Sequence, residues 1–144
     1  MYKLISLLGL VSLFACASQD NAPTSEALIE AIGETPYSAV VTLTGFEGPE
    51  QDGGDNYYKV QAKVLNGIRG HITSKITFDM YTEVGDSPKI GIDPIIITLC
   101  HDEQGYYWPG TGSEFTITQE QVLIAKEAAK NLPDGQIVFA HCDR

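Results

Sequence analysis

The chain has 144 residues, which is enough for one domain with a single hydrophobic core and too few for two. It carries 19 Asp and Glu against 9 Lys and Arg, a formal net charge of -10. So acidic a surface repels nucleic acid phosphates and anionic lipid headgroups, which argues against nucleic acid as a partner and leaves a basic protein partner open. Solubility alone is the simpler explanation of the charge.

Residues 1–16 have the pattern of an export signal and are not expected to belong to the fold. Lys3 precedes an apolar run, residues 4–14, and small residues surround Cys16. A helix needs about 20 apolar residues to cross a membrane, so this run predicts export and not a transmembrane anchor.

The sequence around Cys16 allows two processing outcomes. Residues 13–16, Leu-Phe-Ala-Cys, resemble the lipobox of bacterial lipoproteins, in which the cysteine thiol receives a diacylglyceryl group and becomes the mature N-terminus. Residues 15–17, Ala-Cys-Ala, instead fit an ordinary signal peptidase site, which would release a soluble secreted protein starting at Ser18. We favour lipidation of Cys16, since a cysteine is otherwise hard to explain in a signal peptide. The predicted location is the cell envelope, with Ala17 and Ser18 resembling sorting to an outer membrane facing the periplasm.

The cysteine count agrees with export. Acylation or cleavage at Cys16 leaves Cys100 and Cys142, an even pair in an oxidising compartment. We predict a disulfide between them, which would stabilise the domain by roughly 4 kcal/mol on the chain-entropy estimate. Loss of the signal also removes Lys3, so the mature chain has a net charge of -11.

Residues 17–33 are expected to form a polar tether and a short helix, and residues 34–144 a single β-rich domain. In the first half of that domain the pattern predicts a strand from Ser38 to Phe46 and an acidic loop from Glu47 to Asp55. Asn66-Gly67 is expected to turn the chain between two strands that form an antiparallel hairpin with one face in water. The inward-facing residues of these two strands are predicted to be Tyr58, Val60, Ala62 and Val64, and then Ile72, Ile76, Phe78 and Met80.

The second half of the domain is expected to be built around one buried strand. Residues 95–100 have no polar alternation, which predicts a central strand covered on both faces. Short strands are expected near 106–108 and 114–117, and Thr118 has the capping-box spacing that opens a helix. Residues 137–140 are predicted to form a last strand, parallel to 95–100, with the helix as the crossover.

Three segments together resemble a known module. Residues 57–67, YYKVQAKVLNG, then residues 72–78, and later Gly105-Tyr106-Tyr107 resemble the netrin-like module shared with tissue inhibitors of metalloproteinases. The resemblance implies an OB-type barrel. Those inhibitors place an unmodified N-terminal cysteine of a Cys-x-Cys motif on the zinc of the enzyme. Cys16-Ala17-Ser18 lacks the second cysteine and its first is expected to be acylated, so inhibitory activity does not carry over.

The predicted fold class is therefore mainly β, within the α+β class. We expect a small OB-like barrel or a strongly curved antiparallel sheet, with one substantial C-terminal helix followed by a last strand.

Tyr106, Tyr107 and Trp108 are the candidate binding residues. Aromatic rings next to the turn at Pro109-Gly110 form rigid, amphipathic surface of the kind found at protein and sugar interfaces. The alternative is that two of the three rings pack into the core.

A second candidate site combines Cys100, His101, His141 and Cys142 as a zinc site with two cysteines and two histidines. Neighbouring residues on a strand point to opposite faces, and exported thiols are usually oxidised, so we predict no metal and no cofactor. His101 followed by Asp102-Glu103 could also serve acid-base chemistry, but a polar turn after a buried strand is the simpler interpretation.

The function expected from the sequence is a cell-envelope lipoprotein that acts as a non-catalytic binding or inhibitor-like module, held to the membrane through lipid on Cys16 and bound to an unidentified protein. One alternative is a metal-binding or hydrolytic envelope enzyme that uses His101 and His141. The other is a structural component of the envelope.

Overall fold

The computed structural model describes residues 25–71, 73–91, 93–110, 112–133 and 135–143. The predicted export signal, the lipidation site Cys16, most of the tether, and Ile72 lie outside the described residues. None of the helices in the described part of the chain is long and apolar enough to cross a membrane.

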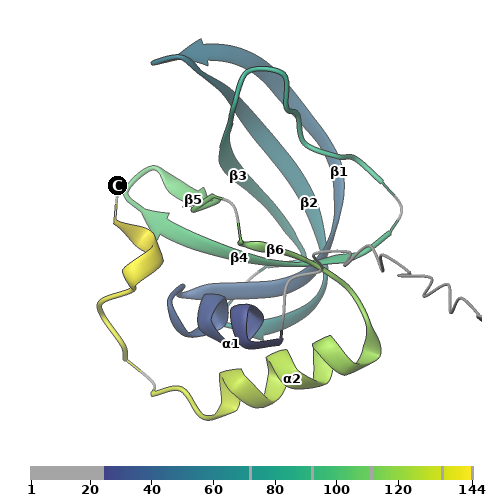
Figure 1. The fold of residues 1–144 in the computed structure, drawn as a ribbon, viewed down its shortest axis with the longest axis vertical. Helices are drawn as coiled ribbons and strands as arrows, with labels where there is room; N and C mark the ends of the chain where they lie inside the picture. Colours follow the sequence, from purple (N-terminus) through teal and green to yellow (C-terminus); the bar gives the residue numbers. More distant parts are fainter. Residues whose placement is uncertain (1–24, 72, 92, 111, 134, 144) are drawn as a thin grey trace, which may run out of the picture.

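The chain folds into a small closed β-barrel of five strands with two helices on one side (Figure 1). The strands follow one another around the barrel in the order β1-β2-β3-β5-β4, pairing of β1 with β4 closes it, and β6 lies along β4. This confirms the predicted mainly β fold with an OB-like barrel and one substantial helix. The elements are α1 (Ser25–Gly33), β1 (Tyr37–Asp52), β2 (Asp55–Arg69), β3 (Lys75–Thr82), β4 (Ile95–Asp102), β5 (Gly105–Tyr107), β6 (Glu114–Thr116), α2 (Gln119–Lys130) and the 3-10 helix η1 (Ala140–Cys142).

The first hairpin is much longer than predicted. The expected acidic loop from Glu47 to Asp55 is instead the end of β1 and a tight turn at Gly53 and Gly54, whose φ angles are +61° and +104°. Positive φ is freely available only to glycine, which accounts for the turn. The prediction was wrong because this end of the hairpin is exposed on both faces, so its sequence shows no apolar alternation.

The predicted turn at Asn66-Gly67 is also wrong. Both residues remain in β2, where they lie opposite Val40 and Ala39 of β1. Shifts of register on either side of these pairs accommodate the Asn-Gly sequence as an irregularity inside the ladder. The antiparallel pairing of β2 with β3 is confirmed, and so are its inward residues: buried Tyr58, Val60, Ala62, Ile76, Phe78 and Met80, with Val64 partly buried.

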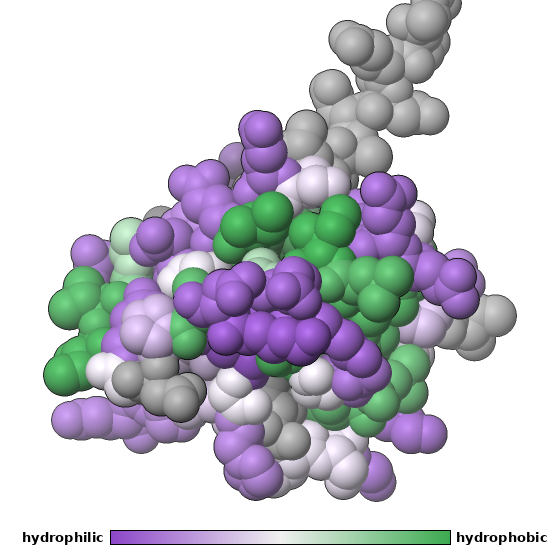
Figure 2. All heavy atoms as spheres, turned by 90° about the horizontal axis from the view of Figure 1, so that it is seen from below, coloured by the Kyte–Doolittle hydropathy of each residue, from purple (hydrophilic) through white to green (hydrophobic). Residues whose placement is uncertain are grey.

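Two apolar clusters hold the fold together, one on each face of β4. Ile97 and Leu99 belong to the interior of the barrel, whereas Ile96 packs on the outer face beneath the two helices. The prediction of a central strand covered on both faces is therefore confirmed. Figure 2 views the helical side and shows a hydrophilic band, where α2 lies, with apolar side chains beside it.

The predicted capping of α2 is confirmed, because the Thr118 side chain accepts a hydrogen bond of 3.1 Å from the backbone N–H of Gln121. The strand predicted at residues 137–140 is not found. Ile137 and Val138 are 90% and 78% exposed in an irregular segment that leads into η1. The parallel pairing was wrong because the edges of β4 are already taken by β1, β5 and β6. The C-terminal tail, residues 135–143, is held instead by contacts with the residues where α1 ends and by the disulfide to β4.

Candidate functional site

The three aromatic residues predicted to bind a partner divide between core and surface. Tyr106 and Trp108 are partly exposed and pack against the barrel interior, while Tyr107 is buried at 5% exposure. The Tyr106 ring makes an edge contact with Tyr37, 4.8 Å between centroids, and burial raises the pKa of its phenol. The alternative that the rings pack into the core is confirmed for Tyr107, and Trp108 also lines a surface hollow, while the binding role stays a prediction.

That hollow consists of two adjoining cavities of about 330 and about 450 Å³, which share Tyr81, Trp108 and Gly110. We call it the Trp108 groove. Its first cavity extends along the C-terminal tail and its second along the loop after β3. The remaining described lining residues are Tyr107, Pro109, His141 and Asp143 in the first, and Asp55, Thr82, Glu83 and Asp86 in the second.

Trp108 forms the centre of the groove and is held through its backbone. Its N–H donates a hydrogen bond of 2.8 Å to the carbonyl oxygen of Asp79, which extends the parallel pairing of β5 with β3. Its indole N–H is buried with no acceptor among the described residues. Such an unsatisfied donor costs about 1–3 kcal/mol. Buried side-chain oxygens of Ser38, Thr98 and Gln121 share this property, so it does not by itself mark a site.

The acidic wall of the groove is a turn fixed by hydrogen bonds. The carbonyl oxygen of Asp86 accepts one from the Tyr58 hydroxyl at 3.1 Å and one from the Thr82 hydroxyl at 3.0 Å. The backbone N–H of Asp86 donates to the Glu83 carbonyl at 3.0 Å. Hydrogen bonds therefore already hold in place the backbone that carries the carboxylates of this loop.

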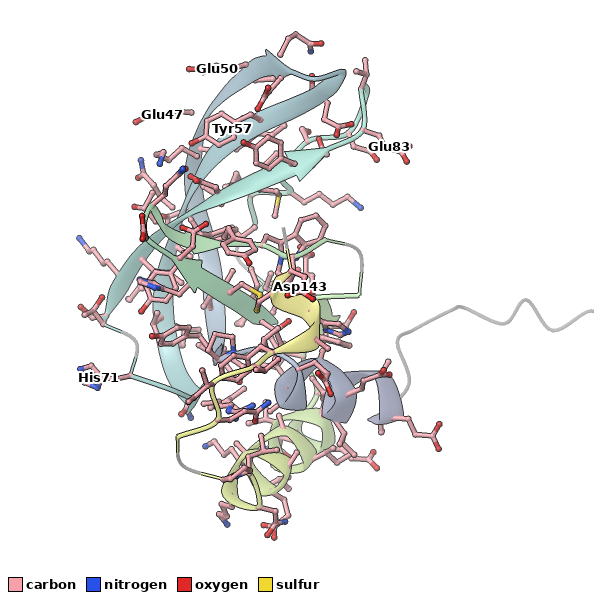
Figure 3. All side chains as sticks on the ribbon, turned by 90° about the vertical axis from the view of Figure 1, so that its left-hand side faces the viewer. Glu47, Glu50, Tyr57, His71, Glu83 and Asp143 are labelled. Carbon is pink, nitrogen blue, oxygen red and sulfur yellow. A yellow bond between two sulfur atoms is a disulfide. The ribbon has the colours of Figure 1, made fainter. Side chains whose placement is uncertain are left out.

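The opposite wall is the C-terminal tail, which the disulfide holds in place. Cys100 and Cys142 lie at disulfide distance, as predicted, with 5.5 Å between their Cα atoms. The Tyr107 hydroxyl donates to the Cys142 carbonyl at 2.6 Å, and the His141 N–H donates to the Glu34 carbonyl at 3.2 Å. In Figure 3 Asp143 of the tail and Glu83 of the loop after β3 lie to the same side of the barrel, whereas Glu47 lies at the opposite edge.

The four residues of the candidate zinc site do not form one. Both sulfurs are in the disulfide and cannot act as thiolate ligands, and no group of three His, Cys, Asp or Glu side chains within the described residues is close enough to hold a metal ion. The two histidines also lie in different surroundings. His101 contacts the rings of Tyr37 and Tyr106 at 5.8 and 5.0 Å between centroids, whereas His141 lines the Trp108 groove.

A polar cluster on the outer face of β2 and β3 was missed, because Asp79 was expected to face water. Asp79 is 9% exposed, and its carboxylate binds the Lys59 ammonium at 2.9 Å and accepts a hydrogen bond of 2.9 Å from the Tyr57 hydroxyl. The hydrogen bond to Asp79 raises the pKa of Lys59. Burial, and then the hydrogen bond to Asp79, raises the pKa of Tyr57. The Tyr57 ring lies 5.2 Å from that of Tyr81, which connects this cluster to the groove.

Arg69 is the second group that sequence reasoning missed. Its guanidinium donates to the carbonyl oxygens of Ile32, Gly33 and Thr35 at 2.8, 3.0 and 3.2 Å, where α1 ends. It also donates to the side-chain oxygen of Gln136 at 2.7 Å. Burial lowers the pKa of Arg69. Nothing in the sequence around residue 69 indicates these contacts, since both partner segments lie far along the chain.

A further hollow of about 530 Å³ lies where α2 begins and is lined by Ile117, Thr118, Gln119, Val122 and Leu123. Its lining is more apolar than that of the Trp108 groove, but nothing in the structure shows what would cover it.

The chain matches no protein-family model, and no curated protein has a significantly similar sequence.

Proposed function

We propose that this protein is a non-catalytic binding module of the cell envelope, anchored through lipid on Cys16, and that the Trp108 groove holds its partner. The observation that carries the proposal is the groove itself. It combines an aromatic centre with two walls whose backbones are held by hydrogen bonds and by the disulfide. Grooves of this kind, with a few polar groups around aromatic side chains, are the usual form of a binding site.

The lining of the groove favours binding over catalysis. Its titratable side chains are four carboxylates, His141 and the phenols of Tyr81 and Tyr107, and the described residues hold no metal-binding cluster around them. The closest-packed polar group, Lys59 with Asp79 and Tyr57, is an ion pair with a hydrogen bond on the outside of the barrel. Neither arrangement supplies an activated nucleophile next to a base.

An inhibitor-like version of the proposal rests on the resemblance to the netrin-like module alone. In it the partner would be an enzyme, bound through the groove and not through an N-terminal cysteine, because Cys16 is expected to carry lipid.

Recovery of binding partners from envelope extracts tests the proposal. The tagged protein would be expressed in its own host as wild type, Tyr81→Ala and Leu65→Ala. Tyr81 is 40% exposed in the groove, and Leu65 is 48% exposed on β2 and lines no described cavity, so it serves as a matched control. We expect a partner that is retained by Leu65→Ala and lost by Tyr81→Ala. Identical recoveries from all three, including no partner at all, would instead support a structural envelope component.

The anchor is tested separately by the intact mass of the mature protein. We expect the mass of the chain from Cys16 onward plus a diacylglyceryl group. A mass that begins at Ser18 would contradict the lipid anchor and leave the groove unaffected.

A further inference from the structure

We infer that the Trp108 groove recognises a positively charged side chain, Arg or Lys, presented by an extended segment of another protein. The inference rests on the proposed binding function and adds the chemistry of the ligand to it. Three features carry it: the sign of the charge around the groove, the aromatic surface at its centre, and its length.

The charged side chains among the described residues that line the groove are acidic, apart from the titratable His141. Four exposed carboxylates surround it, and none of the described residues that line it is Lys or Arg. Two carboxylates elsewhere in the described part of the fold pair with a lysine, Asp79 with Lys59 and Glu127 with Lys130, whereas none of the four groove carboxylates has such a pair among the described residues. A concave site lined by one sign of charge concentrates and orients a ligand of the opposite sign. The four are Asp55, Glu83, Asp86 and Asp143.

The aromatic surface at the centre suits a cation as well. Tyr81 and Trp108 line both cavities, and each is only partly buried. An ammonium or guanidinium group over such a ring is attracted to its π face, and Trp is the best ring for this contact. A cation in the groove would thus contact rings on one side and carboxylates on the other.

Two other ligands fit the groove less well. The described carboxylates form no cluster tight enough to hold a metal ion. A neutral sugar could use the hydroxyl groups and carboxylates of the lining, but it would gain nothing from the net negative charge of the four carboxylates. The groove also continues from the loop at Glu83 to the tail at Asp143 through two cavities. A single side chain would fill only part of it, which favours a peptide segment.

Fluorescence anisotropy with a labelled peptide tests the inference. The probe is a short peptide in which Arg alternates with Gly and Ser, and the control probe carries citrulline, which has the same shape without the charge, at each Arg. The protein is compared with Glu83→Gln/Asp86→Asn in the groove and with Glu120→Gln/Glu127→Gln on α2, which changes the net charge equally at exposed positions. Thermal unfolding of each variant confirms that it is folded.

We expect the Arg peptide to bind the wild type and the α2 variant alike and the groove variant about tenfold more weakly, a difference of about 1.4 kcal/mol. The citrulline peptide should not bind. Equal weakening in both variants would show non-specific attraction to an acidic protein and would overturn the inference. So would equal binding of the two peptides, no binding of either, or binding of a neutral oligosaccharide such as maltohexaose instead. If Tyr81→Ala still loses its envelope partner in any of these cases, the binding function stands and only the assignment of a basic ligand fails.

Discussion

The hydroxyl of Tyr107 donates a hydrogen bond of 2.6 Å to the carbonyl of Cys142, and Tyr107 lies directly opposite Cys100 in the pairing of β4 with β5. The C-terminal tail is thus attached to two neighbouring strands at one point, covalently to β4 and by a hydrogen bond to β5. Because His141 and Asp143 on either side of Cys142 line the Trp108 groove, this attachment also sets one wall of the candidate site.

Reduction of the disulfide should lower the free energy of unfolding by roughly 4 kcal/mol, since the bond closes a loop with a sequence separation of 42. Urea denaturation with and without a reducing agent measures the loss. The reduced protein should also bind its partner more weakly, because the tail wall of the groove is released. In Cys100→Ala/Cys142→Ala the reducing agent should have no effect. If the wild type were equally stable with and without the reducing agent, the claim that the disulfide stabilises the fold would be wrong.

Arg69→Ala should destabilise the protein by about 2–3 kcal/mol. The change leaves the carbonyl oxygens at the end of α1 without their charged donor and also removes the contact with Gln136. Arg69→Lys should recover only part of this, because one ammonium cannot reproduce the planar fork of a guanidinium. The urea midpoint at constant slope measures both variants. The control is Lys63→Ala at an exposed position of the same strand, where we expect a change within about 0.5 kcal/mol.

Thr98→Val should stabilise the protein by up to about 1 kcal/mol, a direction opposite to that of most substitutions. Thr98 and Ser38 are opposite each other in the pairing of β1 with β4, and both hydroxyls are buried without a partner among the described residues. Valine keeps the shape and removes the unsatisfied group. The matched control is Thr35→Val, which loses a hydrogen bond of 2.6 Å to the Ala31 carbonyl and should cost about 1 kcal/mol. Melting temperatures that fall equally in both variants would contradict this account of Thr98.

The stability of the protein should fall as the pH rises above about 10. The pKa values of Lys59 and Tyr57 are raised in the folded state, so above that pH the unfolded chain loses these protons first. The contribution of Lys59 is fully present below its unfolded pKa and is lost as the pH passes its folded value. Lys59 is half exposed, so the effect should stay under about 1 kcal/mol.

Melting temperatures measured from neutral to strongly alkaline pH check this expectation. In Lys59→Gln/Tyr57→Phe the dependence on alkaline pH should be shallower than in the wild type. Curves of equal slope would show that other groups dominate the alkaline unfolding.

The sequence was sufficient where burial follows a local pattern along one element, alternating as in β2 and β3 or continuous as in β4. The inward residues of β2 and β3, the doubly covered β4 and the capped start of α2 all follow from local patterns of apolar and polar residues. It was insufficient where exposure does not alternate. The outer half of the first hairpin is wet on both faces, and Asn66-Gly67 has the composition of a turn but lies within a paired strand.

The last strand was mispredicted for a different reason. Residues 137–140 have strand composition, but β4 has no edge left for them, and strand composition alone does not reveal which edges a barrel leaves free. The candidate site has the same limitation. Trp108 was identified from its turn, whereas the carboxylates at residues 83 and 86 come to it through the path of the loop after β3. Contacts between segments so far apart leave no local pattern.

The closure of the barrel by β1 and β4 has a consequence for how the protein is made. Tyr37 pairs with Leu99, so β1 can pair early with β2, but the closure of the barrel must wait for residues sixty-two positions later in the chain. Pairings this distant make a domain slow to fold, because the entropy of closing the loop is lost before the contact is gained. We therefore expect the barrel of a chain emerging from a ribosome to stay open until its β4 segment is clear.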